Sequence, residues 1–366
     1  MILMDELVPI PEAEIGNDLD FIKMVTVFSS AVLLIGVGFF TWQILSGEIS
    51  LFGPSALALE KEETFHSLIQ YDDVDDLSGN GVGVCIVDSG IDVEHQDLEN
   101  LNLAGWSDFV GTSSSPYDDN GHGTSMAGIL VAEGGLTGLA RGVDLYVAKA
   151  LSENGEGDDS TVAEAIDWCI ASEVDIISLS LGGSPSGFSV ILGDAVEDAV
   201  ETAYDAGIVV VAAAGNDGAN DDGDVASPGI VDTVICVGGV KDSGELWGGS
   251  SIGDNDGRLW PPLLPRNSPD EKPEVVAPAH EVPVILINGE WGFSSGTSAA
   301  TVFVTGAIAL MFDDKPELMD GGPDMLDNLK QWIVDSSKML DGQENHDDHY
   351  GYGLLQMKDL IEASQS

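Results

Sequence analysis

Apolar runs recur along most of the chain, and within each run the apolar residues are continuous rather than alternating. The clearest are Val82–Val87, Asp144–Leu151, Val174–Leu181, Gly207–Ala214, Val234–Val240 and Pro273–Ala277. Such runs are typical of strands buried on both faces of a parallel sheet. Helical patterns lie between them, at 161–168, 188–206 and 298–312. The alternation of strand and helix predicts an α/β fold with a mostly parallel central sheet and helices on both faces.

The segment Met24–Gly47 has 24 residues and no charge. As a helix it is about 36 Å long, enough for a bilayer core of about 30 Å. A cleavable signal peptide is the alternative, but it normally has a basic start and a shorter apolar region. Here six acids precede the single Lys23. We therefore expect an uncleaved transmembrane helix, and Lys23 predicts a cytoplasmic N-terminus with the rest of the chain outside the cell.

The rest of the chain divides by composition. Residues 1–23 form a short acidic tail, 24–47 the membrane span, and 48–80 an acidic, polar connector with one amphipathic stretch at Leu57–Ile69. We expect this connector to be exposed and uncompacted. The α/β pattern occupies residues 81–366, interrupted by a Pro-rich surface insertion at 254–272.

The net charge of the chain indicates the kind of medium in which the protein works. The chain has 64 acidic and 12 basic residues, a net charge of −52. Nucleic-acid binding through a basic patch is excluded, because the cations that would neutralise phosphates are missing. Self-repulsion would oppose a compact state unless salt screens it, and near 1 M salt the Debye length falls to about 3 Å. The composition indicates adaptation to a salt-rich medium; a generally acidic secreted protein is the alternative.

The cysteines carry little information. Cys85, Cys169 and Cys236 are an odd number in apolar surroundings, with no spacing typical of a metal site or a disulfide framework. We expect all three to pack as small buried apolar side chains.

Three short Gly-containing segments carry the candidate chemistry. Asp88 directly follows the first strand, His122 precedes an apolar helix, and Ser298 opens another. A serine can attack a carbonyl carbon if a histidine takes its proton and a carboxylate orients the imidazole. Backbone N–H groups at a helix start can also stabilise an oxyanion. Asn216, after another buried strand, could donate a second hydrogen bond to it.

In the order Asp, His, Asn, Ser, these segments resemble the subtilisin-like serine proteases, the subtilases, over about residues 80–360. The segments SLSLGG at 178–183, KPEVVAP at 272–278 and YGYGL at 350–354 add to the resemblance. It implies a subtilisin-like three-layer α/β fold and serine endopeptidase activity on proteins or peptides, with Asp88, His122 and Ser298 as the triad and Asn216 in the oxyanion hole.

The resemblance also implies a substrate site. Ser180, Leu181 and Gly182 match the edge strand that pairs with an extended substrate. The pocket for the side chain before the cut bond has Ala213, Ala214 and Gly215 as one wall and Ala226 as its floor. A small apolar floor favours a large apolar or aromatic side chain. Lysine or arginine stays the alternative because acids are close in sequence, namely Asp217, Asp221, Asp222 and Asp224.

Some positions depart from the family pattern. Ser125 stands where a second histidine is usual, and Thr301, Val302, Phe303 and Val304 replace the usual residues after the nucleophile segment. Asp97 matches one ligand of a family calcium site, but the loop Glu133–Leu139 is too short to complete it. We expect no required cofactor and no metal there, although calcium at another site stays an alternative. The acidic loops at 217–224 and 254–256 offer oxygen ligands but are expected to be solvated surface, as is the turn with His346, Asp347, Asp348 and His349. The 34 residues of 48–81 are too few for the usual prosegment.

The leading interpretation is a serine endopeptidase tethered to the cell membrane by one helix. A subtilase scaffold that only binds peptides or partners is the first alternative, and its sign would be a lost triad residue. An esterase-type hydrolase is the second. It would need Gly-x-Ser-x-Gly, whereas Ala300 stands two residues after Ser298.

Overall fold

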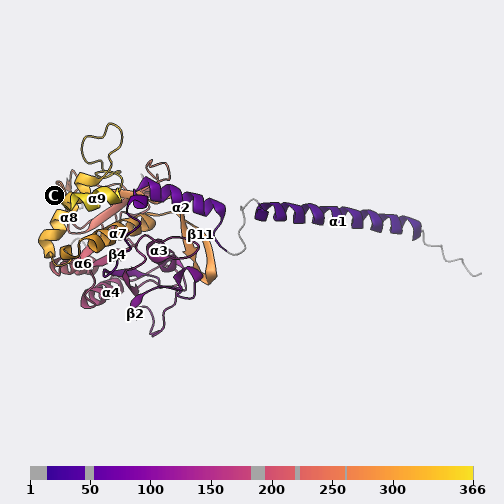
Figure 1. Ribbon diagram of the computed structural model, residues 1–366, viewed down its shortest axis with the longest axis horizontal. Helices are drawn as coiled ribbons and strands as arrows, with labels where there is room; N and C mark the ends of the chain where they lie inside the picture. Colours follow the sequence, from indigo (N-terminus) through magenta and orange to yellow (C-terminus); the bar gives the residue numbers. More distant parts are fainter. Residues whose placement is uncertain (1–14, 46–52, 183–193, 219–222, 260–261, 366) are drawn as a thin grey trace, which may run out of the picture. The chain divides into compact units, whose positions relative to one another are not determined.

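The computed structural model describes residues 15–45, 53–182, 194–218, 223–259 and 262–365. The chain forms two compact units, Met1–Ala56 and Leu57–Ser366. The first contains helix α1 (Ile15–Leu45), shown in Figure 1. Its segment Leu19–Gln43 has 25 residues and a mean hydropathy of 2.1. Among the described residues, α1 is the one helix long and apolar enough to cross a membrane. A signal sequence would have the same properties.

The second unit is built on a seven-stranded sheet with the order β2-β3-β1-β4-β5-β6-β9. Every neighbouring pair is parallel, as the continuous apolar runs predict. The strands are β1 (Gly83–Asp88), β2 (Leu103–Asp108), β3 (Asp144–Lys149), β4 (Ile176–Leu179), β5 (Val209–Ala213), β6 (Ile235–Val240) and β9 (Val275–Pro278). Strand β2 was not predicted, because this edge strand is only partly buried and lacks an apolar run.

Helices cover both faces of the sheet, which confirms the predicted fold class. Alternate residues of β1 point to opposite faces: Val84 and Ile86 join the core under α3 and α7, whereas Cys85 and Val87 join the core under α4 and α6. Two more helices pack near the C-terminus. The bounds are α3 (His122–Val131), α4 (Asp159–Ala171), α6 (Ala195–Asp205), α7 (Thr297–Asp314), α8 (Gly322–Ser336) and α9 (Met357–Ala363). Residues 188–193 of the helix expected at 188–206 lie outside the described residues.

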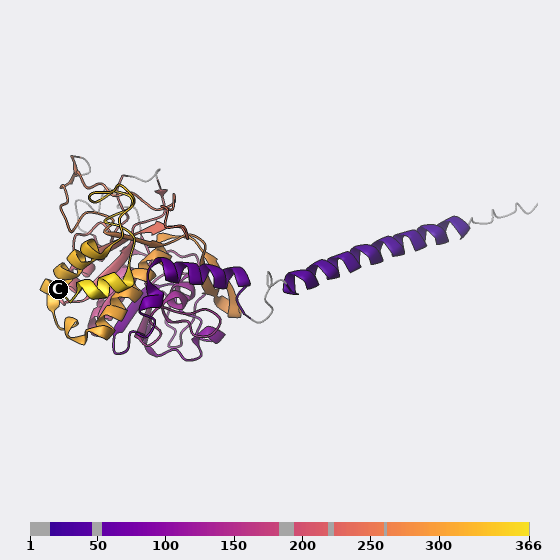
Figure 2. The same ribbon diagram turned by 45° about the horizontal axis from the view of Figure 1, so that its top comes forward.

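The expected connector is partly wrong. Helix α2 (Ala56–Leu68) and the 3-10 turn η1 (Tyr71–Asp73) belong to the large unit. Phe65 packs against Phe303 of α7, with ring centroids 6.4 Å apart, and Ile69 is fully buried. The backbone N–H of Met357 donates to the Ile69 carbonyl at 2.8 Å, so the end of α2 lies next to the start of α9 (Figures 1 and 2). Residues 57–80 are therefore part of the compact domain rather than an uncompacted connector.

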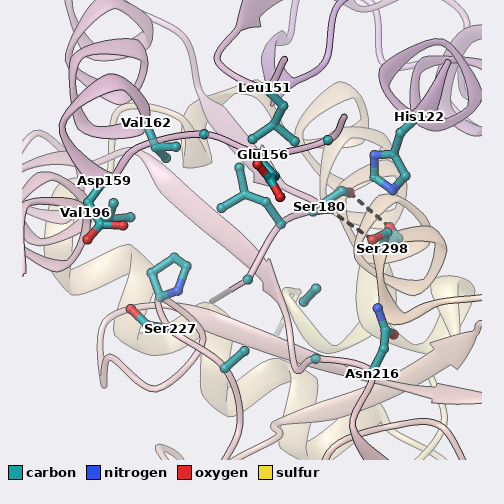
Figure 3. Close-up of a pocket in the computed structure, with 18 of the residues that line it drawn as sticks. His122, Leu151, Glu156, Asp159, Val162, Ser180, Val196, Asn216, Ser227 and Ser298 are labelled. Carbon is teal, nitrogen blue, oxygen red and sulfur yellow. Dashed lines mark hydrogen bonds between the residues drawn. The ribbon is translucent and has the colours of Figure 1, made fainter. Parts of the chain in front are cut away.

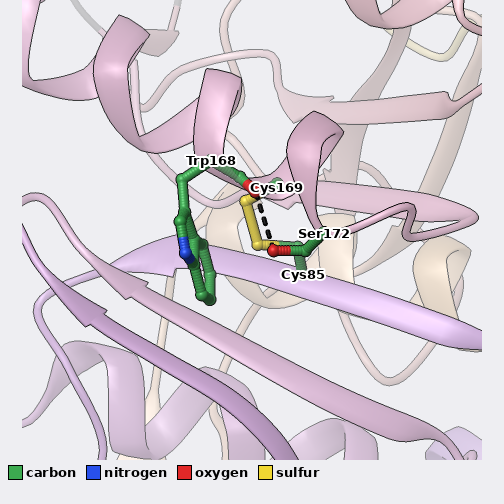
Figure 4. The surroundings of a disulfide bond; sticks show 4 residues. All are labelled: Cys85, Trp168, Cys169 and Ser172. Carbon is green, nitrogen blue, oxygen red and sulfur yellow. Dashed lines mark hydrogen bonds between the residues drawn. A yellow bond between two sulfur atoms is a disulfide. The ribbon is translucent and has the colours of Figure 1, made fainter.

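The prediction of three unpaired cysteines is also wrong. Cys85 of β1 and Cys169 of α4 form a disulfide between two fully buried residues (Figure 4). The partners are 84 residues apart, and only the packing of α4 against the sheet brings them together. Cys236 is free and buried, and burial raises the pKa of its thiol.

Two small antiparallel hairpins complete the strands. The hairpin β10 (Val282–Leu286) and β11 (Glu290–Ser294) packs on α3. The hairpin β7 (Arg258–Leu259) and β8 (Pro262–Leu263) lies in the predicted insertion 254–272. Short 3-10 turns occur at η2 (Gln96–Leu98), η4 (Ile287–Gly289) and η5 (Pro316–Leu318).

Candidate active site

The three candidate catalytic residues come from the ends of three elements. Asp88 is the last residue of β1, His122 is the first residue of α3, and Ser298 is the second residue of α7. Helices α3 and α7 pack against each other on the same face of the sheet. The fold thus brings together side chains that are up to 210 residues apart in sequence (298 − 88).

Asp88 and His122 form a close pair. The imidazole Nδ1 lies 2.8 and 2.9 Å from the two carboxylate oxygens. The Asp88 side chain is fully buried, and that of His122 is 32% exposed. An ionised carboxylate can only accept, so Nδ1 carries the donated proton and Nε2 is left as an acceptor. The negative charge of Asp88 raises the pKa of His122; burial opposes this, and the hydrogen bond to Asp88 and the charge of Asp118 add to it.

Ser298 lies between His122 and Asn216 (Figure 3). Its hydroxyl donates to the Ser180 carbonyl oxygen at 3.0 Å, and the Ser180 hydroxyl donates to the Ser298 carbonyl oxygen at 3.0 Å. The nucleophile candidate is therefore tied to the residue that follows the central strand β4. Residues 180–182, expected to form an edge strand, are not paired into the sheet. As the second residue of α7, it stands where the first backbone N–H groups of a helix have no intrahelical partner.

The orientation of the Asn216 amide follows from its partners. Its Oδ1 accepts the backbone N–H of Thr297 at 2.9 Å. Because an N–H needs an acceptor, the oxygen faces Thr297 and the Nδ2 group faces the cleft near Ser298 (Figure 3). The amide is held in place to donate a hydrogen bond into the site.

A cleft of about 700 Å³ runs from His122, Asn216 and Ser298 past the segment Ser180–Gly182 towards α4 and α6. Of the substrate-binding residues expected from the sequence, Ser180, Leu181, Gly182, Ala213, Gly215 and Ala226 line it. Ala214 does not. It is fully buried against Val225 and Cys236, because alternate residues at this strand end point away from the cleft.

Comparison with known proteins agrees with this geometry. Residues 79–353 match the model of the subtilase family. The chain belongs to the subtilase family. It is 33% identical over 285 residues to the minor extracellular protease Epr of Bacillus subtilis, covering 77% of this chain and 39% of Epr. It is 35% identical over 244 residues to subtilisin NAT of Bacillus subtilis subsp. natto, covering 65% of this chain and 57% of that protein.

The subtilase chain thus spans less than two thirds of these two relatives. A solved structure of a cold-adapted subtilisin-like serine proteinase superposes with a TM-score of 0.61 and 25% identity, over 77% of this chain and 90% of that one. Helix α2 precedes the residues matched to the family model.

One of the acids expected near this subtilase's substrate pocket is already neutralised. Asp224 accepts two hydrogen bonds of 3.0 Å from the buried Arg266. Arg266 belongs to the insertion 254–272, which is therefore anchored beside the cleft. Asp217 is exposed and lines the cleft. Asp221 and Asp222 lie outside the described residues.

Hydrogen bonds link Asp97, the residue matched to the family's calcium site, to the loop after α3 and to Trp291. Asp97 accepts the backbone N–H groups of Gly135 at 2.7 Å and Leu136 at 3.0 Å, and the indole N–H of Trp291 at 2.8 Å. Three N–H donors occupy a carboxylate that would otherwise face the metal. Glu62 of α2 accepts the Thr137 N–H at 2.7 Å and closes the same loop. Asp97 and Glu62 thus hold the loop after α3 by hydrogen bonds to its backbone N–H groups.

The turn at 346–349 has a structural role. His346 Nε2 lies 2.9 Å from the Pro273 carbonyl oxygen, and His349 Nε2 lies 2.7 Å from the Ser250 carbonyl oxygen. Asp348 accepts from the Asn255 amide at 2.8 Å. Within the described ranges, no group of three or more His, Cys, Asp or Glu side chains could hold a metal ion.

Sequence reasoning missed two charged residues near the candidate catalytic residues, Asp118 and Lys149. Lys149 is fully buried and donates to the Ser89 and Leu151 carbonyl oxygens at 2.6 and 2.9 Å and to Asp119 at 2.6 Å. It pairs with Asp88 in the register of the sheet. Asp118 lies four residues before His122, and this short spacing was the available signal.

Proposed function

We propose that this subtilase is a serine endopeptidase in which Asp88, His122 and Ser298 form the catalytic triad. The observation that carries the proposal is the close Asp88–His122 pair, in which Asp88 is buried and His122 lines the cleft together with Ser298 and Asn216. A non-catalytic scaffold would have lost at least one triad residue, and all three are present here.

The reaction follows from this arrangement. Ser298 Oγ leaves the Ser180 carbonyl oxygen, attacks the substrate carbonyl carbon and gives its proton to His122 Nε2. Asp88 stabilises the imidazolium. The Asn216 Nδ2 group and the backbone N–H at the start of α7 stabilise the oxyanion. His122 then protonates the leaving amine, and a water molecule hydrolyses the acyl-enzyme. The freed Ser180 carbonyl can accept a backbone N–H of an extended substrate.

The test is labelling of the full chain with a fluorophosphonate probe in high salt. Wild type should be labelled and Ser298→Ala should not. Ser295→Ala is a matched control, because this exposed serine stands three residues away and should leave labelling unchanged. Labelling that persists in Ser298→Ala would refute the proposal.

The pocket next to Ser298 favours an apolar side chain before the cut bond. A Cβ atom at Gly182 would lie 2.9 Å from Ala226 Cβ, and one at Gly215 would lie 3.2 Å from it. The two glycines therefore keep a narrow slot open above an apolar floor, and Arg266 neutralises Asp224. Peptides with Leu or Phe at this position should be cut faster than peptides with Lys, and Gly182→Ala should selectively slow cleavage after Phe. A preference for Lys would contradict this proposal.

Helix α1 supports a membrane anchor with the catalytic domain outside the cell. The buried Cys85–Cys169 disulfide adds to this support, because disulfides persist in oxidising compartments. Protease added to intact cells should remove a tag placed after Ser366 and spare one at Met1. Loss of the Met1 tag during maturation would indicate a signal peptide, and the reverse accessibility would place the domain in the cytoplasm.

The charge supports a protein that works at high salt. Four of the 12 basic residues, Lys149, Arg266, Lys272 and Lys330, are buried, so few cations are left to balance the acidic surface. Dialysis from molar to about 0.1 M salt should unfold the domain as screening is lost. Retained activity at low salt would contradict this proposal.

We also propose that the fold requires no calcium. The saturated Asp97 carboxylate supports this. Adding EDTA or millimolar calcium in high salt should leave the melting temperature unchanged, and a calcium-dependent rise would contradict it.

A further inference from the structure

A single carboxylate collects the hydrogen bonds of the loop that leads to His122. Asp118 Oδ1 accepts from the Ser89 hydroxyl at 2.9 Å and from the backbone N–H groups of Asn120 and Gly121 at 3.0 and 2.8 Å. Its Oδ2 accepts from the backbone N–H of Thr124 at 2.9 Å and from the Thr124 hydroxyl at 2.7 Å. Five donors thus converge on one side chain.

These donors lie on both sides of the catalytic pair. Gly121 and Thr124 flank His122, and Ser89 directly follows Asp88. The Ser89 hydroxyl also accepts the backbone N–H of Gly123 at 2.9 Å. The two segments touch at this point, since a Cβ atom at Gly123 would lie 2.2 Å from the Gly90 carbonyl oxygen. Asp118 therefore ties the start of α3 to the end of β1.

We propose that Asp118 is a positioning residue for catalysis, which clamps the His122 loop to the Asp88 strand end and adds a second negative charge near the imidazolium. The inference rests on the proposed function of the triad. Asp118 touches no substrate in this role. It acts through the distance between Asp88 and His122, and small displacements of such a pair are costly to catalysis.

The charge on Asp118 is maintained by its donors. Burial by itself would raise the pKa of Asp118, but the hydrogen bonds from Gly121, Thr124 and Asn120 outweigh it and lower the pKa. The charge of Asp118 in turn adds to the larger effect of Asp88 in raising the pKa of His122. Lys149 and Asp119 form an ion pair near this loop. The other charged residues near His122 line the cleft or a second pocket beside it, namely Glu156, Asp217 and Glu290.

The test compares Asp118→Asn with Asp108→Asn in the full chain, in detergent and high salt. Asp108 is a matched control, because it accepts three backbone N–H groups in the preceding loop, those of Val110, Gly111 and Ser113, and the Tyr117 hydroxyl. None of these donors belongs to the segments of Asp88, His122 or Ser298. Asp118→Asn should lower kcat roughly ten- to a hundred-fold with little change in KM. Its loss of charge should also move the acidic limb of the kcat/KM profile to lower pH.

Asp108→Asn should change neither kcat nor the pH profile. Ser89→Ala separates the clamp from the charge: it should lower kcat and leave the acidic limb in place. If Asp118→Asn keeps kcat within about two-fold and an unchanged pH profile, or only loses thermal stability as Asp108→Asn does, the proposal is overturned.

A readout without hydrolysis distinguishes failure of the clamp from failure of the proposed function. Histidine labelled with 13C reports the titration of His122, assigned by comparison with His122→Ala. Asp118→Asn should shift this titration to lower pH even if the wild type cuts no peptide. An unchanged titration, in a variant that melts like the wild type, would overturn the inference by itself.

Discussion

Near each end of helix α3, an aspartate accepts several hydrogen bonds, but the two aspartates hold different parts of the molecule. At its start, Asp118 accepts N–H and O–H groups from the segments that carry His122 and Asp88. Beyond its end, Asp97 accepts N–H groups from Gly135, Leu136 and Trp291. Both carboxylates are satisfied by several donors. They differ in what the donors belong to: the segments of the proposed triad at one end, and a loop and a hairpin at the other.

The comparison teaches that the role of an aspartate with several hydrogen-bond donors is set by its partners rather than by its residue type. Changes at the start of α3 should act on kcat, and changes beyond its end should act on stability. The predictions that follow test this separation, beginning with the largest effect.

The largest loss is expected at the catalytic end. Asp88→Asn keeps the shape of the side chain but allows the wrong imidazole tautomer, so kcat should fall about 10⁴-fold. The melting temperature should change little compared with that loss. Peptide hydrolysis and thermal unfolding in molar salt measure both. Activity within tenfold of wild type would remove Asp88 from the triad.

A smaller kinetic loss is expected at Asn216. If Nδ2 stabilises the oxyanion, Asn216→Ala should lower kcat roughly 10²–10³-fold with KM nearly unchanged. Steady-state kinetics on a peptide substrate decide this. A rise in KM alone would assign Asn216 to substrate positioning.

Beyond the end of α3, the effect should be on stability. Asp97→Ala leaves three buried or half-buried N–H donors without their acceptor, at a cost of about 1–3 kcal/mol for each orphaned group. Denaturant unfolding should shift to lower midpoints, while kcat of the folded fraction stays at the wild-type value. A variant with lowered kcat and wild-type stability would show that the two ends of α3 are not separate.

The smallest effect concerns pH and the loop beyond α3. Burial raises the pKa of Glu62 to about 7, the hydrogen bond from Thr137 opposes this, and the charge of Asp97 adds to it. The folded state therefore binds the proton more tightly than the unfolded state, so stability falls as pH rises from about 4.5 to 7. Glu62→Gln keeps the hydrogen-bond acceptor and removes the charge.

Glu62→Gln should melt at a higher temperature than wild type at pH 8 and at the same temperature near pH 4. Thermal scans at the two pH values measure this difference. Equal melting temperatures at pH 8 would show that the carboxylate is not destabilising.

Local patterns predicted a large part of this protein. The continuous apolar runs located six of the seven sheet strands, because a strand buried on both faces needs apolar residues at successive positions. The Gly-flanked Asp88, His122 and Ser298 segments predicted the site, because strand ends and helix starts in a parallel sheet converge at one edge. Each of these inferences uses only the residue types within a few positions of the element concerned.

Tertiary packing decided the rest. The disulfide joins Cys85 to Cys169 across 84 residues, Phe65 is buried by Phe303, and Arg266 neutralises Asp224. None of these pairs has a local signal, since each depends on the strand order and on which helix covers which face. Asp118 shows the same limit at short range. Its position before His122 is visible in the sequence. Its proposed role depends on the hydrogen bond from Ser89, which follows β1 and is 29 residues away.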